Sequence, residues 1–583
     1  MSASRPNILL ITSDQQHWNT LGCLNPEIQT PNLDRLAREG TLYHRAYCPN
    51  PTCTPTRASM ITGKYPSQHG AFSLGMKLPE HEPTVGDVFQ QAGYRTALVG
   101  KAHFQQLWGT DEFPSLESYP IMQDLDFWRD FHGPFYGFEH VELARNHTDE
   151  AHVGQHYAIW MEENGLTNWR DYFQPPTGNN PNQKHKWSIP ERYHYNTWIA
   201  ERTSALLEQY RQRGENFFLW ASFFDPHPPY LVPEPWDTMY DPAQITVPQV
   251  TPGEHERSPL PLQMTQQPAP DYSPWFEPGG HAMHGFHSHL HNRAELAKDI
   301  ACYYGMISCM DKYIGLILYR LDELGLADNT LVVFTSDHGH FYGHHGLIAK
   351  GPFHYEDVIR VPFLVRWPGR VPAGKESHAL QTLVDLPQSF LSACGIAPPA
   401  DMTGVDQMPV WRGEAESARD HVLIEHHHQP TTIHTRTYVD ARYKLTVNCL
   451  RPYGELFDME ADPGEINNLW DDPAYEALKA ELVWKLLLAE MAREERLTDE
   501  SAQWPNKSAA MYTKTFNNGS WTITVDPANN IYALHDVGQY STRKQVNLWD
   551  DPACRKIRSQ MILGLQFARM AAEPMWMSRV AGA

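Results

Sequence analysis

Short apolar runs constrain the fold of this chain most strongly, because a sheet built from such strands must be covered on both of its faces. Residues 7–13 (NILLITS) show no alternation of apolar and polar side chains, which is typical of an inner strand of a parallel sheet. The other runs that predict strands are 94–100, 216–224, 330–336 and 361–367. Helical patterns occur at 32–39, 84–91, 192–213 and 294–324. Strands that alternate with helices predict an α/β fold with a doubly wound sheet.

Polar residues follow the carboxyl ends of four of these predicted strands. They are Asp14, Lys101, His227 and Asp337. In an open α/β sheet this edge is where ligands bind. The sequence therefore predicts a functional site that is assembled from the strand ends.

Residues 53–62 form a predicted helix that begins with a cysteine. Pro55 suits a first helical turn, and Gly63 suits a C-terminal stop. Cys53 and Arg57 are four residues apart, so they share one face of the helix. Because a helix N-terminus favours an anion, we expect Cys53 to be a reactive thiolate.

The longer run 51–66 (PTCTPTRASMITGKYP) closely resembles the signature of the sulfatase family, in which a C-x-P-x-R motif directs oxidation of its cysteine to formylglycine. The resemblance covers most of residues 5–475, and within the family the chain resembles most the branch of arylsulfatases and phosphonate monoester hydrolases. It implies an alkaline-phosphatase-like fold: a doubly wound, mostly parallel sheet with a smaller C-terminal α+β subdomain. It also implies that a formylglycine-generating maturation enzyme acts on Cys53.

Two pairs of residues predict a site for one divalent cation. Asp14-Gln15 and Asp337-His338 both stand at strand ends, and the modified Cys53 would add oxygen ligands. Either pair alone would more often be a cap or a turn. Many sulfatases have Asp-Asp at the first pair, so Gln15 removes one negative charge. We expect Ca²⁺ first, with Mn²⁺ or Mg²⁺ as alternatives.

The resemblance also implies which residues form the positive side of the site. Lys101 and His103 match a G-K-x-H segment, His227 matches a segment with a substrate-facing histidine, and Lys350 matches a lysine that contacts the ester oxygen. In the implied roles Arg57 holds the hydrated aldehyde and Lys101 the sulfate. His227 and Lys350 stabilise or protonate the leaving oxygen, and His103 acts as the base.

The expected activity is hydrolysis of a small-molecule aryl or alkyl sulfate to an alcohol and sulfate. The nearest alternative is a phosphonate monoester or phosphodiester hydrolase on the same site, although retention of Lys101 and His103 favours the sulfatase. A two-zinc phosphodiesterase is disfavoured because no full second ligand set is evident around His344 and His345. A non-catalytic binding protein on a sulfatase scaffold is the remote alternative.

The predicted domains are a catalytic domain at 1–415, an α+β subdomain at 416–500 and an extension at 501–583. Within the first, the irregular insertion at 104–194 is either a pocket wall or lid or a structural excursion. The motif NLWDDPA occurs at 468–474 and again at 547–553, an offset of 79 residues. Strand-like runs precede each motif and a helical pattern follows it, so the extension is predicted to be a second copy of the subdomain.

The composition, and the lack of an evident signal peptide, predict a soluble enzyme. A net charge of −22 disfavours nucleic acid and anionic membrane partners. Eight cysteines without regular spacing indicate a reduced compartment, and no signal peptide is evident, so we expect a cytoplasmic protein. The histidine-rich run 281–291 fits no standard metal pattern and is predicted to be a loop. We expect a homo-oligomer, with the second copy serving assembly or pocket closure.

Overall fold

A computed structural model describes residues 5–107, 109–110, 114–145, 152–173, 184–268, 270–275, 292–428, 432–493, 513–527, 529–537 and 546–573. The histidine-rich run 281–291 lies outside these residues. The chain divides into a large unit, formed mainly by residues up to 432, and a small unit, formed mainly by residues 433–574. The domain boundaries predicted at 415 and 500 stay a prediction.

The large unit is built on an eight-stranded sheet, with the strand order β10-β2-β9-β7-β1-β6-β4-β5. Its centre is parallel and, apart from Arg95 at the start of β4, buried, as the apolar runs predicted. The central strands are β1 (Asn7–Ser13), β4 (Arg95–Gly100), β6 (Phe217–Ser222) and β7 (Thr330–Ser336). The doubly wound α/β fold is thus confirmed.

One side of this sheet is mixed. The predicted strand at 361–367 is divided at Pro362 into β8 (Arg360–Val361) and β9 (Phe363–Arg366). β9 runs antiparallel to both β7 and β2 (Thr41–Tyr43). The remaining short strands of the unit are β3 (Ala46–Tyr47), β10 (Lys375–Ser377), β11 (Gln381–Thr382) and β12 (Val422–His428).

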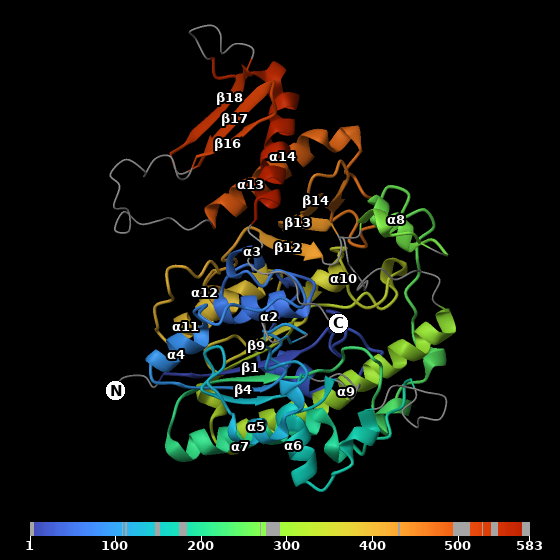
Figure 1. Cartoon of the computed structure of the whole chain (residues 1–583), viewed down its shortest axis with the longest axis vertical. Helices are drawn as coiled ribbons and strands as arrows, with labels where there is room; N and C mark the ends of the chain where they lie inside the picture. Colours follow the sequence, from blue (N-terminus) through green and yellow to red (C-terminus); the bar gives the residue numbers. More distant parts are fainter. Residues whose placement is uncertain are drawn as a thin grey trace. The chain divides into compact units, whose positions relative to one another are not determined.

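Helices cover both faces of the sheet (Figure 1). On one face lie α2 (Cys53–Thr62), α4 (Val85–Gln91), α11 (Leu386–Ala393) and α12 (Met408–Trp411). On the other lie α5 (Leu125–Asp130), α6 (Gln155–Glu163), α7 (Tyr195–Arg213) and α9 (Arg293–Glu323). The other helices are α1 (Pro31–Glu39), α3 (Pro66–His69), α8 (Leu260–Thr265) and α10 (Glu356–Ile359).

The insertion at 104–194 is more ordered than its sequence predicted. It contributes α5, α6 and the strand β5 (His140–Leu143), which pairs in parallel with β4 and extends the central sheet. The expectation of an irregular segment is therefore wrong for these residues. A four-residue strand and short helices are too brief to give a clear period in an aromatic-rich sequence.

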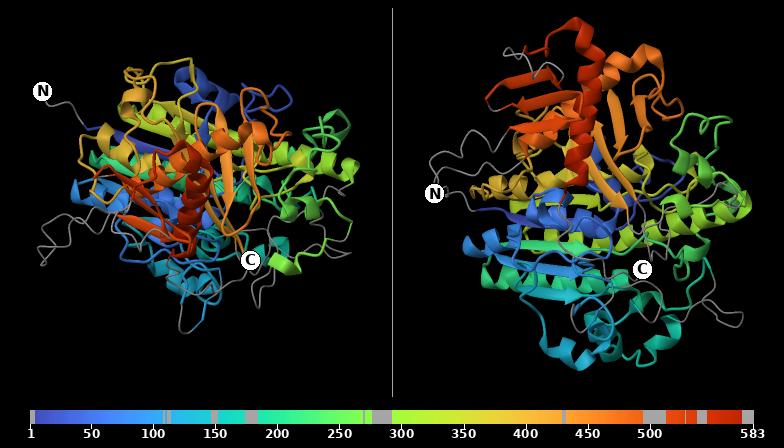
Figure 2. Two further views of the ribbon diagram at one scale, coloured as in Figure 1. Left: turned by 90° about the horizontal axis from the view of Figure 1, so that it is seen from above. Right: turned by 45° about the horizontal axis from the view of Figure 1, so that its top comes forward.

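The small unit contains two structurally alike copies of one motif. The first copy consists of β13 (Ile433–Val439), β14 (Tyr443–Asn448), β15 (Gly454–Asp458) and α13 (Glu476–Ala492). The second copy consists of β16 (Lys514–Asn517), β17 (Trp521–Asp526), β18 (Ile531–Asp536) and α14 (Arg555–Ala571). In Figure 2 the red strands of the second copy lie beside α14. Each copy therefore has three consecutive antiparallel strands followed by one helix.

Among the described residues, no helix combines the length and the apolar character that a membrane span requires. All eight cysteines are free thiols, including Cys302 and Cys309 on α9.

Candidate active site

The candidate site lies where the central strands end together. Ser13 pairs with Ser336, and Gly100 pairs with Ser222, so β1, β7, β4 and β6 finish at one edge. The next residues along the chain are Asp14, Asp337 and Lys101, and all three side chains are buried. The structure thus brings together polar residues that are up to 323 positions apart in the sequence.

Cys53 points into this group of residues from the first turn of α2. The helix ends at Gly63, whose φ of 65° is a left-handed conformation that favours glycine. The Cys53 side chain is fully buried, and its Sγ lies 3.2 Å from His338 Nε2 and 3.7 Å from Asp14 Oδ1. The predicted thiol is therefore at the centre of the site.

Four side chains could hold one metal ion. Ligand atoms of Asp14, Cys53, Asp337 and His338 all lie within 4.8 Å of one another. His338 donates from Nδ1 to the carbonyl of Gly339 at 3.0 Å, so its Nε2 lone pair faces the cluster. A metal-binding histidine is commonly oriented by such a bond.

Gln15 supplies a further observation that fits a metal ion. Its side-chain oxygen and nitrogen are buried without a hydrogen-bond partner in the described structure, and its φ is 62°. A buried polar group without a partner costs free energy unless a ligand satisfies it. Carboxylate and amide oxygens suit a hard divalent cation, and the imidazole extends the choice toward Mn²⁺.

Arg57 fixes the geometry of the strand ends. Its Nε donates to Asp337 Oδ2 at 2.8 Å, and one terminal nitrogen donates to the Lys101 carbonyl at 2.9 Å and to Ser222 Oγ at 2.8 Å. The other terminal nitrogen lies 3.6 Å from Asp14 Oδ2. One guanidinium therefore connects all four strand ends.

Two ammonium groups stabilise negative charge at residue 53. Lys350 Nζ lies 3.1 Å and Lys101 Nζ lies 3.7 Å from Cys53 Sγ, and Lys101 also donates to Asp14. Burial and the Asp14 carboxylate raise the pKa of the Cys53 thiol, but Lys101 and Lys350 outweigh them and the net pKa lies below its ordinary value. An oxyanion at this position would be stabilised in the same way.

His227 lies beside Lys350. Its Nδ1 donates to the carbonyl of Pro228 at 2.6 Å, and its Nε2 accepts from Lys350 Nζ at 3.0 Å. Burial, with the positive charges of Lys350 and Lys101, holds the pKa of His227 well below its ordinary value. The pair presents an ammonium donor and a neutral imidazole on one side of Cys53.

His103 is held in a strained conformation with unused nitrogens. Its φ is 62°, and neither ring nitrogen has a hydrogen-bond partner among the described residues. Burial, with the nearby charge of Lys101, keeps the pKa of His103 well below its ordinary value. The imidazole is therefore neutral and able to accept a proton.

Glu117, from the insertion, holds the loop that carries His103. Its buried carboxylate accepts from the backbone nitrogens of His103, Phe104 and Gln105 at 2.5, 2.7 and 2.9 Å. Sequence reasoning missed this residue, because a glutamate in an irregular segment gives no local signal. The contact shows that the insertion supports the site.

A second cluster of possible metal ligands, around one of the two histidines for which the sequence showed no full ligand set, consists of His17, His344 and Asp357. His17 Nε2 lies 3.0 Å from Asp357 Oδ1, while His17 Nδ1 accepts from the backbone nitrogen of Asn19 at 3.0 Å. Because Nδ1 accepts, the proton of the neutral ring is on Nε2 and points at the carboxylate. The cluster is thus a hydrogen-bonded network, in which His345 also contacts Asp357 at 3.2 Å.

Comparison with known proteins gives two family matches. A family model described as "Sulfatase" matches residues 6–396, and one described as "N-sulphoglucosamine sulphohydrolase, C-terminal" matches residues 343–492. The second copy in the small unit lies beyond both matches.

Similar sequences and structures extend these matches. An arylsulfatase of Clostridium perfringens is 28% identical over 85% of this chain and 96% of its own length. An N-acetylglucosamine-6-O-sulfatase of Bacteroides thetaiotaomicron is 28% identical over 82% of this chain and 85% of its own length. The structure of a phosphonate monoester hydrolase from Silicibacter pomeroyi aligns with a TM-score of 0.69 at 24% identity, over 85% of this chain and 98% of the other. The last likeness shows a shared fold.

Proposed function

The chain belongs to the sulfatase family, and from this premise we propose that it hydrolyses sulfate monoesters to an alcohol and inorganic sulfate. The observation that carries the proposal is the convergence of Cys53, a group of possible metal ligands and two ammonium groups at one sheet edge. A sulfate ester needs a nucleophile, neutralisation of its spectator oxygens and a proton for its leaving oxygen. The site has a group for each of these requirements.

We propose that Cys53 acts after conversion to formylglycine by a maturation enzyme, so that Cys53 Sγ marks the place of the two hydroxyls of the hydrated aldehyde. One hydroxyl oxygen attacks sulfur while the bond from sulfur to the ester oxygen breaks. Lys350, with His227 beside it, gives the proton that the departing alcohol requires, and the proton that the attacking hydroxyl loses replaces it on this pair. The product of this step is a sulfated enzyme.

Breakdown of the sulfated enzyme needs a base. His103 is neutral, and its ring nitrogens have no hydrogen-bond partner in the part of the chain that the structure describes, so it can take the proton of the remaining hydroxyl. The carbon–oxygen bond to the sulfate group then breaks, sulfate leaves and the aldehyde is restored. Arg57 orients the hydrated aldehyde, and Lys101 neutralises sulfate oxygens.

A divalent cation completes the proposed site. Asp14, Gln15, Asp337, His338 and the oxygens of residue 53 would hold it, and we propose Ca²⁺, with Mn²⁺ or Mg²⁺ as the alternatives. When bound, the cation would supply positive charge that polarises the sulfate group. We also propose that the protein is a homo-oligomer and works in the cytoplasm.

Turnover of matched esters tests the reaction class. We expect higher kcat/KM for aryl and alkyl sulfates than for phenyl phosphonate monoesters, because an extra substituent on phosphorus would crowd Lys101 and His103. Some phosphonate turnover is expected, since both centres are tetrahedral and anionic. Preference for phosphonates over every sulfate would overturn the proposal in favour of the phosphonate hydrolase. No turnover of any ester by metal-loaded, formylglycine-containing protein would favour a binding protein.

A further inference from the structure

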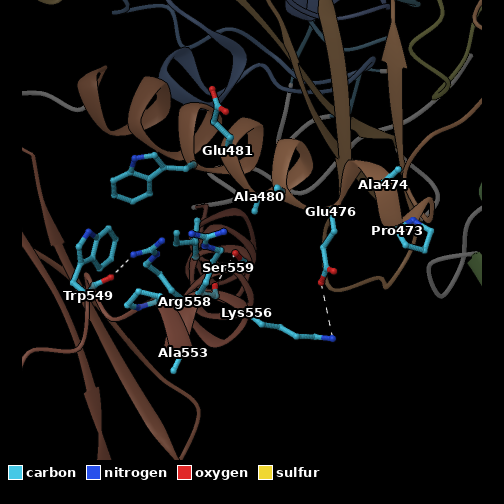
Figure 3. Close-up of a pocket in the computed structure, with 15 residues that line it drawn as sticks. Pro473, Ala474, Glu476, Ala480, Glu481, Trp549, Ala553, Lys556, Arg558 and Ser559 are labelled. Carbon is cyan, nitrogen blue, oxygen red and sulfur yellow. Dashed lines mark hydrogen bonds and ion pairs between the residues drawn. The ribbon is translucent and has the colours of Figure 1, made fainter.

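A cleft in the small unit lies between the N-terminal parts of the helices of the two copies. Its volume is about 750 Å³, and it is lined by the first turns of α13 and α14 together with the motifs that precede them (Figure 3). This volume is in the range of sites for small molecules, which is about 300–1,000 Å³. Nothing in the proposed catalytic cycle uses this cleft.

The two walls of the cleft are equivalent in structure but opposite in charge. At the offset of 79 residues, Glu476 of α13 corresponds to Arg555 of α14, and Ala477 corresponds to Lys556. The α13 wall carries the carboxylates of Glu476 and Glu481, whereas the α14 wall carries the cations of Arg555, Lys556 and Arg558. Lys556 Nζ and Glu476 Oε1 approach to 4.0 Å across the cleft (Figure 3).

One end of the cleft is aromatic, and this follows from a glycine of the first copy that is a tyrosine in the second. In the first copy Trp470 is buried and packs on Gly454, where a Cβ would lie 2.6 Å from the indole. The corresponding position in the second copy is Tyr532, because Asn468 and Asn547 bind the carbonyls of Gly454 and Tyr532 in the same way.

Tyr532 keeps the second tryptophan away from the strand. Its ring stacks on Trp549 with centroids 5.5 Å apart, and Trp549 is half-buried at the cleft. Trp484 of α13 lies 5.3 Å from the same indole. Arg558 lies over the indole and donates to the Trp549 carbonyl, which fixes the guanidinium at this end (Figure 3). The change from glycine to tyrosine has therefore placed an indole in a charged cleft.

We propose that this cleft binds a sulfated saccharide, separately from the catalytic site. The C–H face of a sugar ring packs on indole, and sulfate oxygens accept charge-assisted hydrogen bonds from Arg555 and Lys556. The carboxylates of Glu476 and Glu481 require a ligand that donates hydrogen bonds, and sugar hydroxyls do so. An aryl sulfate offers the anion and the flat face but no donor for the carboxylates. The choice of a sulfated ligand rests on the proposed sulfatase function.

Calorimetry on the full-length Cys53→Ala protein tests this site without turnover. The probes are a sulfated glucose tetrasaccharide, the same tetrasaccharide without sulfate, and 4-nitrophenyl sulfate. We expect the sulfated tetrasaccharide to bind at a site whose affinity falls at least tenfold in Trp549→Ala and in Lys556→Glu. The controls Tyr319→Ala and Lys298→Glu, which change an exposed aromatic ring and an exposed cation of α9, should leave binding unchanged.

Three results would overturn the inference. The first is that the sulfated tetrasaccharide binds both cleft variants as tightly as it binds the parent. The second is that the unsulfated tetrasaccharide binds the parent as tightly as the sulfated one. The third is that 4-nitrophenyl sulfate binds as tightly as the sulfated tetrasaccharide and loses this affinity in Trp549→Ala. If Trp549→Ala fails to fold, Lys556→Glu decides alone, because Lys556 is exposed. Turnover of 4-nitrophenyl sulfate by the unmutated chain measures the proposed function independently, and neither cleft variant should change it.

Discussion

Two buried charge clusters, one in each unit, show what distinguishes a reactive site from a structural one. In the active-site cluster, Gln15, Arg57 and His103 keep buried polar atoms without a hydrogen-bond partner among the described residues. In the C-terminal charge cluster the central charges pair with one another: Arg436 donates to Glu490 at 3.0 Å and also to Glu573, while Gln566 donates to Glu490 at 2.7 Å. The charges of the first cluster therefore face the reactive atom of residue 53, whereas those of the second pair with one another, although Gln566 Oε1 has no hydrogen-bond partner among the described residues.

The C-terminal charge cluster connects the two copies of the small unit. Arg436 is on β13 and Glu490 on α13 of the first copy, whereas Gln566 is on α14 and Glu573 follows it. Removing one partner from such a cluster leaves a buried charge unpaired, which costs more than the pair itself contributes. Variants in the first cluster should therefore change activity, and variants in the second should change stability.

The largest effect is expected from Cys53→Ala. Loss of the nucleophile should lower kcat at least ~10⁴-fold, while the unfolding midpoint stays close to that of the parent because only one sulfur atom is removed. The matched control is Cys48→Ala, a buried thiol whose pKa burial raises well above its ordinary value. Peptide mass spectrometry of active protein should find formylglycine at position 53. Full activity with an unmodified thiol would contradict the assignment.

Asp337→Ala should remove metal and activity together. The carboxylate belongs to the proposed ligand set and also accepts from Arg57, so its loss should lower metal stoichiometry and decrease kcat/KM about 10³-fold. Elemental analysis and kinetics on the same preparation measure both effects. His344→Ala is the control, because the tautomer of His17 indicates a network without a metal, and the stoichiometry should stay that of the parent. Unchanged metal content in Asp337→Ala would exclude the predicted ligand set.

Arg436→Met in the C-terminal charge cluster should lower stability and leave activity unchanged. It removes the closest cation from Glu490 and Glu573, although other basic side chains remain within 4.0 Å of both, and should lower the free energy of unfolding by about 3 kcal/mol. Urea denaturation measures this loss, and kcat of the folded enzyme should not change. Arg442→Met breaks a pair with Asp458 in which the arginine side chain is about half-exposed, and it should cost less. Similar costs for the two variants would show that the C-terminal charge cluster is not structural.

The sequence predicted the sheet and most of the site because these features leave local signals. Buried strands are apolar runs, and the residues after them, such as Asp14 and Asp337, must lie at the edge where parallel strands end. Cys53 and Lys350 were found through their resemblance to family motifs. Glu117, β5 and the pairing of Arg436 with Glu573 depend on contacts between distant residues, so no local pattern contained them.

The smallest effect is expected where the insertion supports the active site. Glu117 is a positioning residue: its carboxylate accepts three backbone N–H groups of residues 103–105 and so holds the strained backbone of His103. Glu117→Gln replaces one acceptor oxygen by an NH₂ group that faces those donors. We expect kcat to fall about tenfold with little change in KM, because a displaced base slows breakdown of the sulfated enzyme more than substrate binding.

The accumulation of the sulfated enzyme distinguishes positioning from a general loss of stability. Rapid-quench mass spectrometry should detect more of it in Glu117→Gln than in the parent, as in His103→Ala, because attack survives while proton removal is slowed. Glu117→Asp keeps two acceptor oxygens on a shorter side chain and should recover part of the rate. A lower unfolding midpoint without accumulation would mean that Glu117 only stabilises the fold. Then the insertion would support the structure of the large unit without tuning its chemistry.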